Sequence, residues 1–137
     1  MREIKFRAWD SFNKRMVIDN ESVLRGLLFN VQSDGALDTL KFMQYTGLKD
    51  KNGREIYEGD IIYWEIDNGV GIESYAAIVQ WSENNEKYKG IYKWIVLYIE
   101  DYLRGQFDAL STPASYNYEL QVMGNIYENP ELLEVSE

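Results

Sequence analysis

A chain of 137 residues with 45% hydrophobic and 27% charged residues has the size and composition of one folded domain, which argues against a disordered or fibrous protein. The sequence contains no Cys and no His, and this excludes disulfides, Cys/His zinc sites, thiolate nucleophiles and catalysis by an imidazole base. The formal net charge of −9 lies in residues 61–137, which hold 4 basic and 13 acidic side chains, against 10 of each in residues 1–60. We interpret this asymmetry as a source of solubility and of charge pairing between the two parts.

The first elements along the chain are predicted to form a hairpin. Residues 3–9 alternate apolar side chains with Glu3, Lys5 and Arg7, which is the pattern of a strand with one apolar and one mainly basic face. After a polar stretch, residues 16–18 are apolar again, so we expect them to return beside the first strand.

Residues 20–32 carry an ambiguous pattern. Their apolar side chains fit one face of a helix capped by Asn20, but Gly26 interrupts that helix. The turn signal Asp34-Gly35, just before the apolar residues 37–45, favours a second hairpin. We therefore interpret residues 20–32 as a strand, with the helix as the alternative.

Two further turn signals, Asn52-Gly53 and Asn68-Gly69, stand between apolar segments and predict a meander of antiparallel strands. Residues 60–66 and 75–81 are expected to be strands that are buried on most of both faces. Residues 91–99 form the most apolar segment, so we expect them to be the central strand of the sheet.

The last part of the chain is predicted to contain short elements. Residues 100–110 have apolar side chains at helical spacing and indicate a short helical turn. A final strand is expected over residues 118–127, where Gly124 allows a bulge or a close approach of the backbone. Asn129 followed by Pro130 indicates one closing helical turn with Asn129 as its cap. No repeat or linker divides the chain, so residues 1–137 are interpreted as a single domain.

Three segments in this order resemble the hallmarks of the YopX family of phage and prophage proteins. They are FRAWD at residues 6–10, FMQYTGLKDKNGREIYEGDII at residues 42–62 and MGNIYENPELL at residues 123–133. The resemblance implies a phage-encoded or prophage-encoded, self-associating protein of Gram-positive bacteria, and it supplies no catalytic residues. The entry Gly59-Asp60 before an apolar strand is similar to the start of small SH3-like barrels. The expected fold is mainly β, an antiparallel meander with an SH3-like barrel core and a short C-terminal helical turn.

The tightest acidic cluster consists of Glu55, Glu58 and Asp60. Carboxylates at this spacing could hold Mg²⁺ or act as an acid/base pair in a metal-dependent hydrolase. Acids beside a glycine turn more often bond nearby backbone amides, so a structural role is favoured and no metal or other cofactor is expected.

The N-terminal strand also places cations beside rings that could stack on nucleic-acid bases. Arg2, Lys5 and Arg7 alternate with Phe6 and lie close to Trp9. The whole-molecule charge of −9 opposes contact with a phosphate backbone, so direct nucleic-acid binding is disfavoured.

Aromatic residues make up 15% of the chain, with 4 Trp, 11 Tyr and 5 Phe. Trp64, Trp81 and Trp94 lie in apolar segments and are assigned to the core. A surplus of Tyr beside Trp and Arg is typical of interfaces, although core packing explains the tyrosines equally well. The candidate binding residues are Phe6, Arg7, Trp9, Tyr45, Tyr57, Tyr92, Tyr118 and Tyr127, with Tyr88 and Tyr116 as further tyrosines of this kind.

The preferred interpretation is a non-catalytic protein that self-associates and binds a host or phage protein through these faces or through open sheet edges. One alternative is an acidic inhibitor that imitates nucleic acid and binds a host DNA-binding protein, and another is the carboxylate hydrolase. No apolar run approaches the roughly 20 residues of a membrane span, and the N-terminus lacks an apolar signal core. The predicted location is therefore the bacterial cytoplasm.

Overall fold

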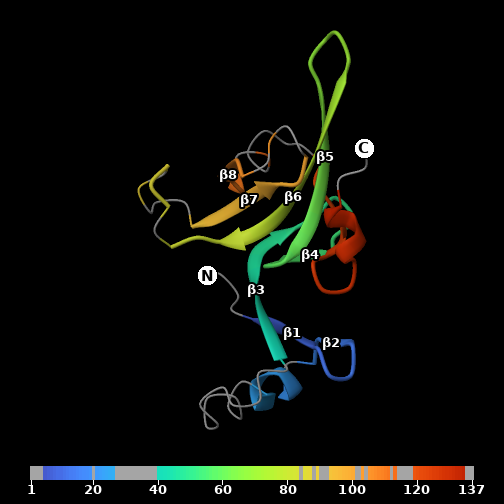
Figure 1. Cartoon of the computed structure of the whole chain (residues 1–137), viewed down its shortest axis with the longest axis vertical. Helices are drawn as coiled ribbons and strands as arrows, with labels where there is room; N and C mark the ends of the chain where they lie inside the picture. The colour runs from blue at the N-terminus through green and yellow to red at the C-terminus, as the bar shows by residue number, and fades with distance from the viewer. Residues whose placement is uncertain are drawn as a thin grey trace.

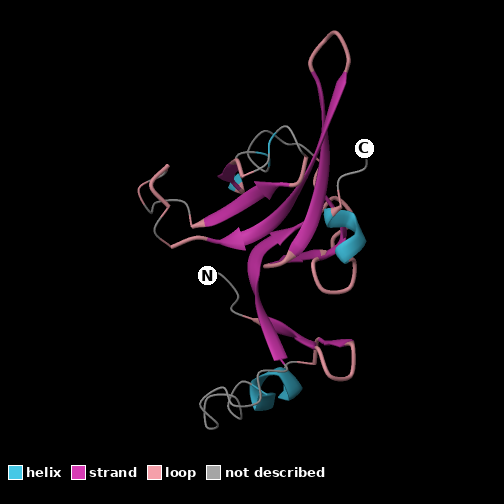
Figure 2. Ribbon diagram, viewed as in Figure 1, coloured by secondary structure: helices cyan, strands magenta, loops and turns pink. Residues whose placement is uncertain are grey.

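The computed structural model describes residues 5–19, 21–26, 40–83, 85–87, 89, 93–100, 103, 105–111, 113 and 119–134. In these ranges the chain forms two antiparallel sheets, as the strand arrows of Figures 1 and 2 show. The mainly β fold predicted from the alternating pattern is confirmed. The turn signal Asp34-Gly35 and the candidate residues Arg2, Tyr88, Tyr92, Tyr116 and Tyr118 lie outside the described residues.

The first sheet has the strand order β2-β1-β3-β4. It consists of β1 (Phe6–Asp10), β2 (Arg15–Val17), β3 (Leu40–Lys49) and β4 (Glu55–Tyr57). The predicted first hairpin is confirmed, since β1 and β2 are antiparallel neighbours. Strand β3 is long enough to pair with β1 through its first half and with β4 through its second half. It therefore connects the N-terminal hairpin to the rest of the molecule.

The second sheet has the order β8-β7-β6-β5-β9 and curls into a half-barrel, in partial agreement with the expected barrel core (Figure 2). Its strands are β5 (Asp60–Asp67), β6 (Ile72–Trp81), β7 (Trp94–Tyr98), β8 (Phe107–Ala109) and β9 (Gln121–Asn125). The middle strand is β6, so the prediction that the apolar segment 91–99 is central is wrong. Strand β7 is interior because the short edge strand β8 covers its outer side.

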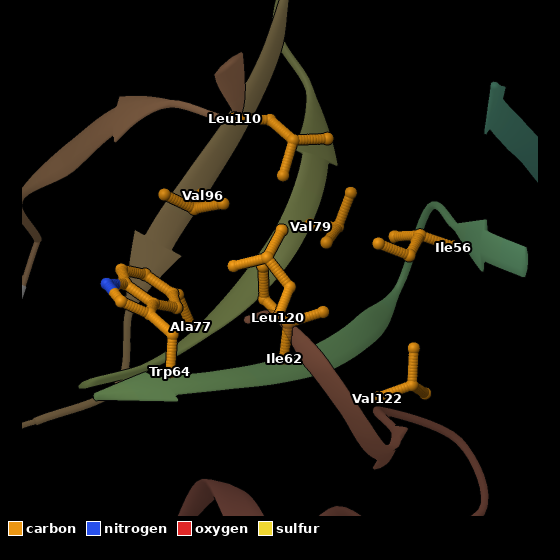
Figure 3. Packing of buried hydrophobic residues seen from close by; sticks show 9 residues of the cluster. All are labelled: Ile56, Ile62, Trp64, Ala77, Val79, Val96, Leu110, Leu120 and Val122. Carbon is orange, nitrogen blue, oxygen red and sulfur yellow. The ribbon is translucent and has the colours of Figure 1, made fainter. Parts of the chain in front are cut away.

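The main core lies on the concave side of the half-barrel (Figure 3). Ile62, Val79 and Val96 come from three neighbouring strands and are fully buried, and Ile56 of β4 packs against them from the first sheet. Trp64 is 2% exposed and supplies the largest ring. Burying rings and branched side chains is the main source of stability in a β domain of this size.

Residues 21–26 are helical, so the strand interpretation of this part of residues 20–32 is wrong. The helical turn is started by Asp19, because its carboxylate accepts hydrogen bonds from the Ser22 amide (3.1 Å) and hydroxyl (2.7 Å). The Glu21–Arg25 pair spans one turn, and the buried Val23 anchors the segment. The cap thus lies one residue before the predicted Asn20. No helix within the described residues is long and apolar enough to cross a membrane.

The helical turn predicted over residues 100–110 is replaced in part by β8. Gly105 has φ +82°, which ends the turn after Leu103, and the chain then extends as Phe107–Ala109 beside β7. Leu110 follows the strand and is buried in the main core. The apolar residues at helical spacing in this segment therefore belong to a turn that is followed by a strand, and not to one helix.

The prediction for Gly124 is confirmed in both respects. The register with β5 changes between Ile61 and Ile62, which marks a bulge in β9. An added Cβ at Gly124 would lie 2.3 Å from Asn129 Oδ1. Asn129 uses this oxygen to accept the Asn125 amide at 3.2 Å. The closing turn is confirmed as the 3-10 helix η2 (Pro130–Leu133), and Asn129 occupies its N-cap position as predicted, although its side chain makes no capping hydrogen bond.

The hairpin between β5 and β6 projects from the body of the protein, at the top of Figure 1. We call residues 65–74 the arm. Asn68-Gly69 forms its turn, as predicted, and Gly69 adopts φ +89°. Among the described strands, β9 and β7 pair with β5 and β6 below the arm, so the arm's two strands pair with each other alone.

Candidate interaction surfaces

Two cations, Lys5 just before β1 and Arg7 within it, lie over two tyrosine rings at the junction between the sheets. The Lys5 Nζ is 5.4 Å from the centre of the Tyr45 ring, and the Arg7 guanidinium carbon is 4.6 Å from the centre of the Tyr57 ring. The two rings are 5.5 Å apart. The sequence-predicted residues Arg7, Tyr45 and Tyr57 are therefore brought together, in contacts that are favourable between a cation and a ring face.

Arg7 and Asp60 form a buried ion pair in this cluster. The distance from Arg7 Nη2 to Asp60 Oδ1 is 2.5 Å, and the side chains are 12% and 1% exposed. Asp60 Oδ2 also accepts the Tyr57 backbone amide at 2.8 Å. Burial raises the pKa of Asp60, and the Arg7 charge and these hydrogen bonds oppose that rise. The pair fixes β1 to the start of β5.

The remaining candidate residues extend the same junction. Trp9 stacks on Tyr127 with ring centres 6.2 Å apart, and both pack against the buried cluster of Met43, Tyr45 and Tyr57. Phe6 is half-buried. Since Tyr45 and Tyr57 are 4% and 9% exposed, these two rings hold the fold together inside the chain. Trp81, assigned to the core from its apolar segment, is instead 36% exposed and contacts Trp94 edge to face.

The ion pairs of the described residues lie within each part of the chain. Lys5 pairs with Glu55 and Arg7 with Asp60, both inside residues 1–60, while Lys87 pairs with Asp108 inside the acidic part. In the described portion of the chain no ion pair joins residues 1–60 to residues 61–137.

The three candidate metal-binding carboxylates have separate environments. Glu55 faces Lys5, Asp60 faces Arg7, and burial raises the pKa of Glu58 while a hydrogen bond involving the Gln44 backbone opposes that rise. Over the described residues, no group of three or more acidic side chains could hold a metal ion. A hollow of about 440 Å³ lies elsewhere, beside β2 and the helical segment 21–26, and its lining includes Met16, Val17 and Val23.

The arm is the most exposed described surface that the aromatic pattern did not indicate. Of its ten residues only Ile66 is partly buried, and Val70 and Ile72 are 94% and 67% exposed at the tip. Exposed apolar side chains that gather in one patch are typical of an interaction site. The sequence did contain a signal, since Val70 and Ile72 are apolar residues inside and next to a turn, where burial is not available.

A second exposed end is the loop between β1 and β2, whose exposed residues 12–15 we call the basic tip. Phe12 is 81% exposed, and Lys14 and Arg15 extend beside it. Asp10 lies behind this surface, because the residue is 8% exposed and its carboxylate accepts hydrogen bonds from the Phe12 and Asn13 amides and from the Asn13 side chain. The side-chain and backbone hydrogen bonds from Asn13 lower the pKa of Asp10.

Comparison with known proteins places this fold in a family. The sequence model described as YopX protein matches residues 5–134, so the chain belongs to the YopX family, as the three motifs predicted. Among solved structures, it is similar to the crystal structure of protein EF1440 from Enterococcus faecalis, with 23% sequence identity and a TM-score of 0.57. That likeness covers 98% of this chain and 100% of the other, and it concerns the fold alone. No curated protein matches the sequence.

Proposed function

We propose that this YopX protein is a non-catalytic, self-associating protein-binding module that acts in the cytoplasm of a bacterium carrying the phage or prophage. The observation that carries the proposal is the arm. A two-stranded ribbon by itself is only marginally stable in water, and this one presents Val70 and Ile72 to solvent. A second protein that covered these side chains would stabilise the ribbon and remove the apolar surface from water.

Open strand edges support the same proposal. Arm residues 65–67 and 72–74 have no further strand beside them within the described parts of the chain. An exposed edge offers backbone donors and acceptors in a row, and addition of a strand from another chain is a common mode of association. The aromatic candidates Tyr45 and Tyr57 are buried, so the arm is the better candidate for first contact.

The test is the mass of the protein in solution, measured by sedimentation equilibrium over a wide concentration range. We expect the wild-type mass to exceed the 16.1 kDa of one chain and to rise with concentration. A variant in which residues 66–73 are replaced by a two-residue Asn-Gly turn should remain at the mass of one chain. Its thermal melting, followed by tryptophan fluorescence, checks that the half-barrel still folds.

The outcomes are separable. A wild-type protein that stays at 16.1 kDa at every concentration would contradict self-association. Association that persists unchanged in the shortened variant would move the interface away from the arm. The nucleic-acid-mimic alternative receives less support, since the arm carries three carboxylates, on both of its faces, rather than a long row of them.

A further inference from the structure

We infer that the arm of one copy docks on the basic tip of a second copy, in a head-to-tail contact. This inference rests on the proposed self-association and names the two surfaces that form it. Its basis is that one chain carries, at two separate ends, surfaces of opposite charge that each include a large exposed apolar side chain.

The arm is purely acidic. Residues 61–81 contain no Lys or Arg, and their three acids, Glu65, Asp67 and Glu73, all lie in the arm and are exposed. The pairing of β5 with β6 places Asp67 opposite Ile72 and Glu65 opposite Ser74. Since cross-strand partners and alternate residues share a face, one face of the arm combines two carboxylates with the exposed Ile72.

The basic tip has the complementary character. Its exposed residues 12–15 contain Lys14 and Arg15 and no acid. The nearest carboxylate, Asp10, is buried among its own hydrogen bonds and lies 3.9 Å from Arg15 Nε, at the outer limit of an ion pair. Phe12 supplies an apolar side chain beside the two cations, as Ile72 does beside the two carboxylates. Opposite charges around an apolar contact favour one orientation and speed the encounter of the two surfaces.

The position of the two surfaces prevents them from meeting inside one chain. Figure 1 shows the arm at one end of the long axis and the hairpin of β1 and β2 towards the other end. Among the described strands, β2 is the outermost of its sheet, so its outer edge is the position at which a strand of an arm would add. A contact between two different surfaces repeats from copy to copy, and it produces a ring if the rotation closes and a filament if it does not.

Charge reversal tests the contact. An arm variant, Glu65→Lys with Asp67→Lys, reverses both carboxylates on the face that carries Ile72 and makes the arm net positive, and a tip variant, Lys14→Glu with Arg15→Glu, makes the tip negative. Each variant alone should stay at the mass of one chain, because its arm and its tip then carry the same sign. An equimolar mixture should associate again, since each arm now meets a tip of opposite charge. Raising salt from about 0.05 M to about 0.5 M should weaken wild-type association by about tenfold or more.

Each result of the mass measurement has a defined meaning. If both variants associate as the wild type does, or if the mixture stays monomeric while the wild type associates, the arm-to-tip contact is wrong and self-association stands. If the wild type is itself monomeric at all concentrations, the proposed function fails. If each variant has the same melting temperature as the wild type, its loss of association is not caused by unfolding.

Disulfide trapping gives a second, independent readout, because the chain has no cysteine of its own. Phe12→Cys and Val70→Cys are exposed positions at the two ends, and Lys51→Cys is an exposed control in the turn between β3 and β4. Under mild oxidation, the Phe12 and Val70 variants should form a mixed disulfide dimer faster than either forms one with the Lys51 variant. Equal rates for all pairs would contradict the inference.

Discussion

At the scale of single residues, the buried ion pair of Arg7 and Asp60 shows how a charged side chain is accommodated in the interior of this protein. A charge without a partner in a protein interior is costly, whereas a paired and hydrogen-bonded one is tolerated. Asp60 satisfies both oxygens, one with the guanidinium and one with the Tyr57 amide. The alternating pattern of the sequence places Arg7 on a polar face of its strand. It could not predict that Asp60, 53 positions away, pairs with Arg7 and covers it.

We predict that Asp60→Asn lowers the free energy of unfolding by about 3–5 kcal/mol, because it leaves the Arg7 guanidinium buried without a counter-charge. The matched control is Glu55→Gln, whose partner Lys5 and whose own side chain are each 30% exposed, and its loss should be below about 1 kcal/mol. Urea unfolding followed by tryptophan fluorescence measures both.

The double variant Arg7→Met with Asp60→Asn separates charge from packing. It should recover part of the stability that Asp60→Asn loses, since no unpaired buried charge is then left at the site of the Arg7–Asp60 pair. Equal losses for Asp60→Asn and Glu55→Gln would show that the buried pair has no special weight.

At the scale of elements, strands and turns followed the local pattern, and the exceptions have local causes. The hairpins at Asn52-Gly53 and Asn68-Gly69 were predictable because a tight turn needs a residue at positive φ. Residues 21–26 were misassigned, since the Asp19 cap and the Glu21–Arg25 pair favour a helix that Gly26 was expected to prevent. Residues 107–109 form a strand because they pair with the outer edge of β7. This pairing is a tertiary contact, so the local sequence pattern could not predict it.

The bulge in β9 gives a prediction for Gly124. Gly124→Ala should lower the free energy of unfolding by about 1–3 kcal/mol, because the new Cβ would overlap the Asn129 side chain and displace its hydrogen bond to the Asn125 amide. Gly71→Ala is the control, since nothing lies within 4 Å of its Cβ position, and its effect should stay within about 0.5 kcal/mol. Differential scanning calorimetry of the two variants compares them. Partial recovery in Gly124→Ala with Asn129→Ala would confirm the cause, and an equal effect of the two single glycine variants would contradict it.

At the scale of the whole molecule, Asp50 connects segments that are far apart in the sequence. Its carboxylate accepts the Asn52 and Arg54 amides at 2.9 and 2.8 Å within the turn between β3 and β4, and the Val122 amide of β9 at 3.0 Å. Burial acts to raise the pKa of Asp50, but the three amide hydrogen bonds outweigh it, and the pKa is lowered. Both sheets therefore depend on one ionised carboxylate.

The lowered pKa determines how stability should change with pH. A carboxyl whose pKa is lower in the folded chain than in the unfolded one stabilises the fold above the unfolded value, near 3.9, and this contribution is lost as pH falls through the folded value. At pH 6, Asp50→Asn should cost about 1–3 kcal/mol of unfolding free energy. The difference from wild type should stay near its pH 6 value down to about pH 5 and should then shrink below about pH 4, when urea unfolding is repeated down to pH 3.

A surface control completes this experiment. Glu86→Gln changes an exposed acid in the loop after β6 and should alter stability by less than about 0.5 kcal/mol at pH 6. A difference for Asp50→Asn that stays constant from pH 6 to pH 3 would show that the charge of Asp50 does not matter.

The overall class of the molecule could be predicted, but its candidate surfaces could not. Composition, alternation and the three motifs were sufficient for a mainly β member of the YopX family. Of the aromatic candidates within the described residues, Trp9, Tyr45, Tyr57 and Tyr127 gather at the junction. The sequence could not predict this, because it does not specify which strand faces another. The exposure of Phe12 and Val70 depends on how far each of their hairpins extends beyond the neighbouring strands. That length is defined only when the sheets have assembled.

The stacking of Trp9 on Tyr127 has a consequence for synthesis on the ribosome. Synthesis begins at the N-terminus, so β1 is made early. Trp9 can stack on Tyr127 only after the ribosome has added that residue, 118 positions later. A nascent or prematurely terminated chain that stops before β9 would leave this indole and the neighbouring methionines uncovered. Such exposed side chains are what chaperones and proteases recognise, so the stack distinguishes finished molecules from fragments.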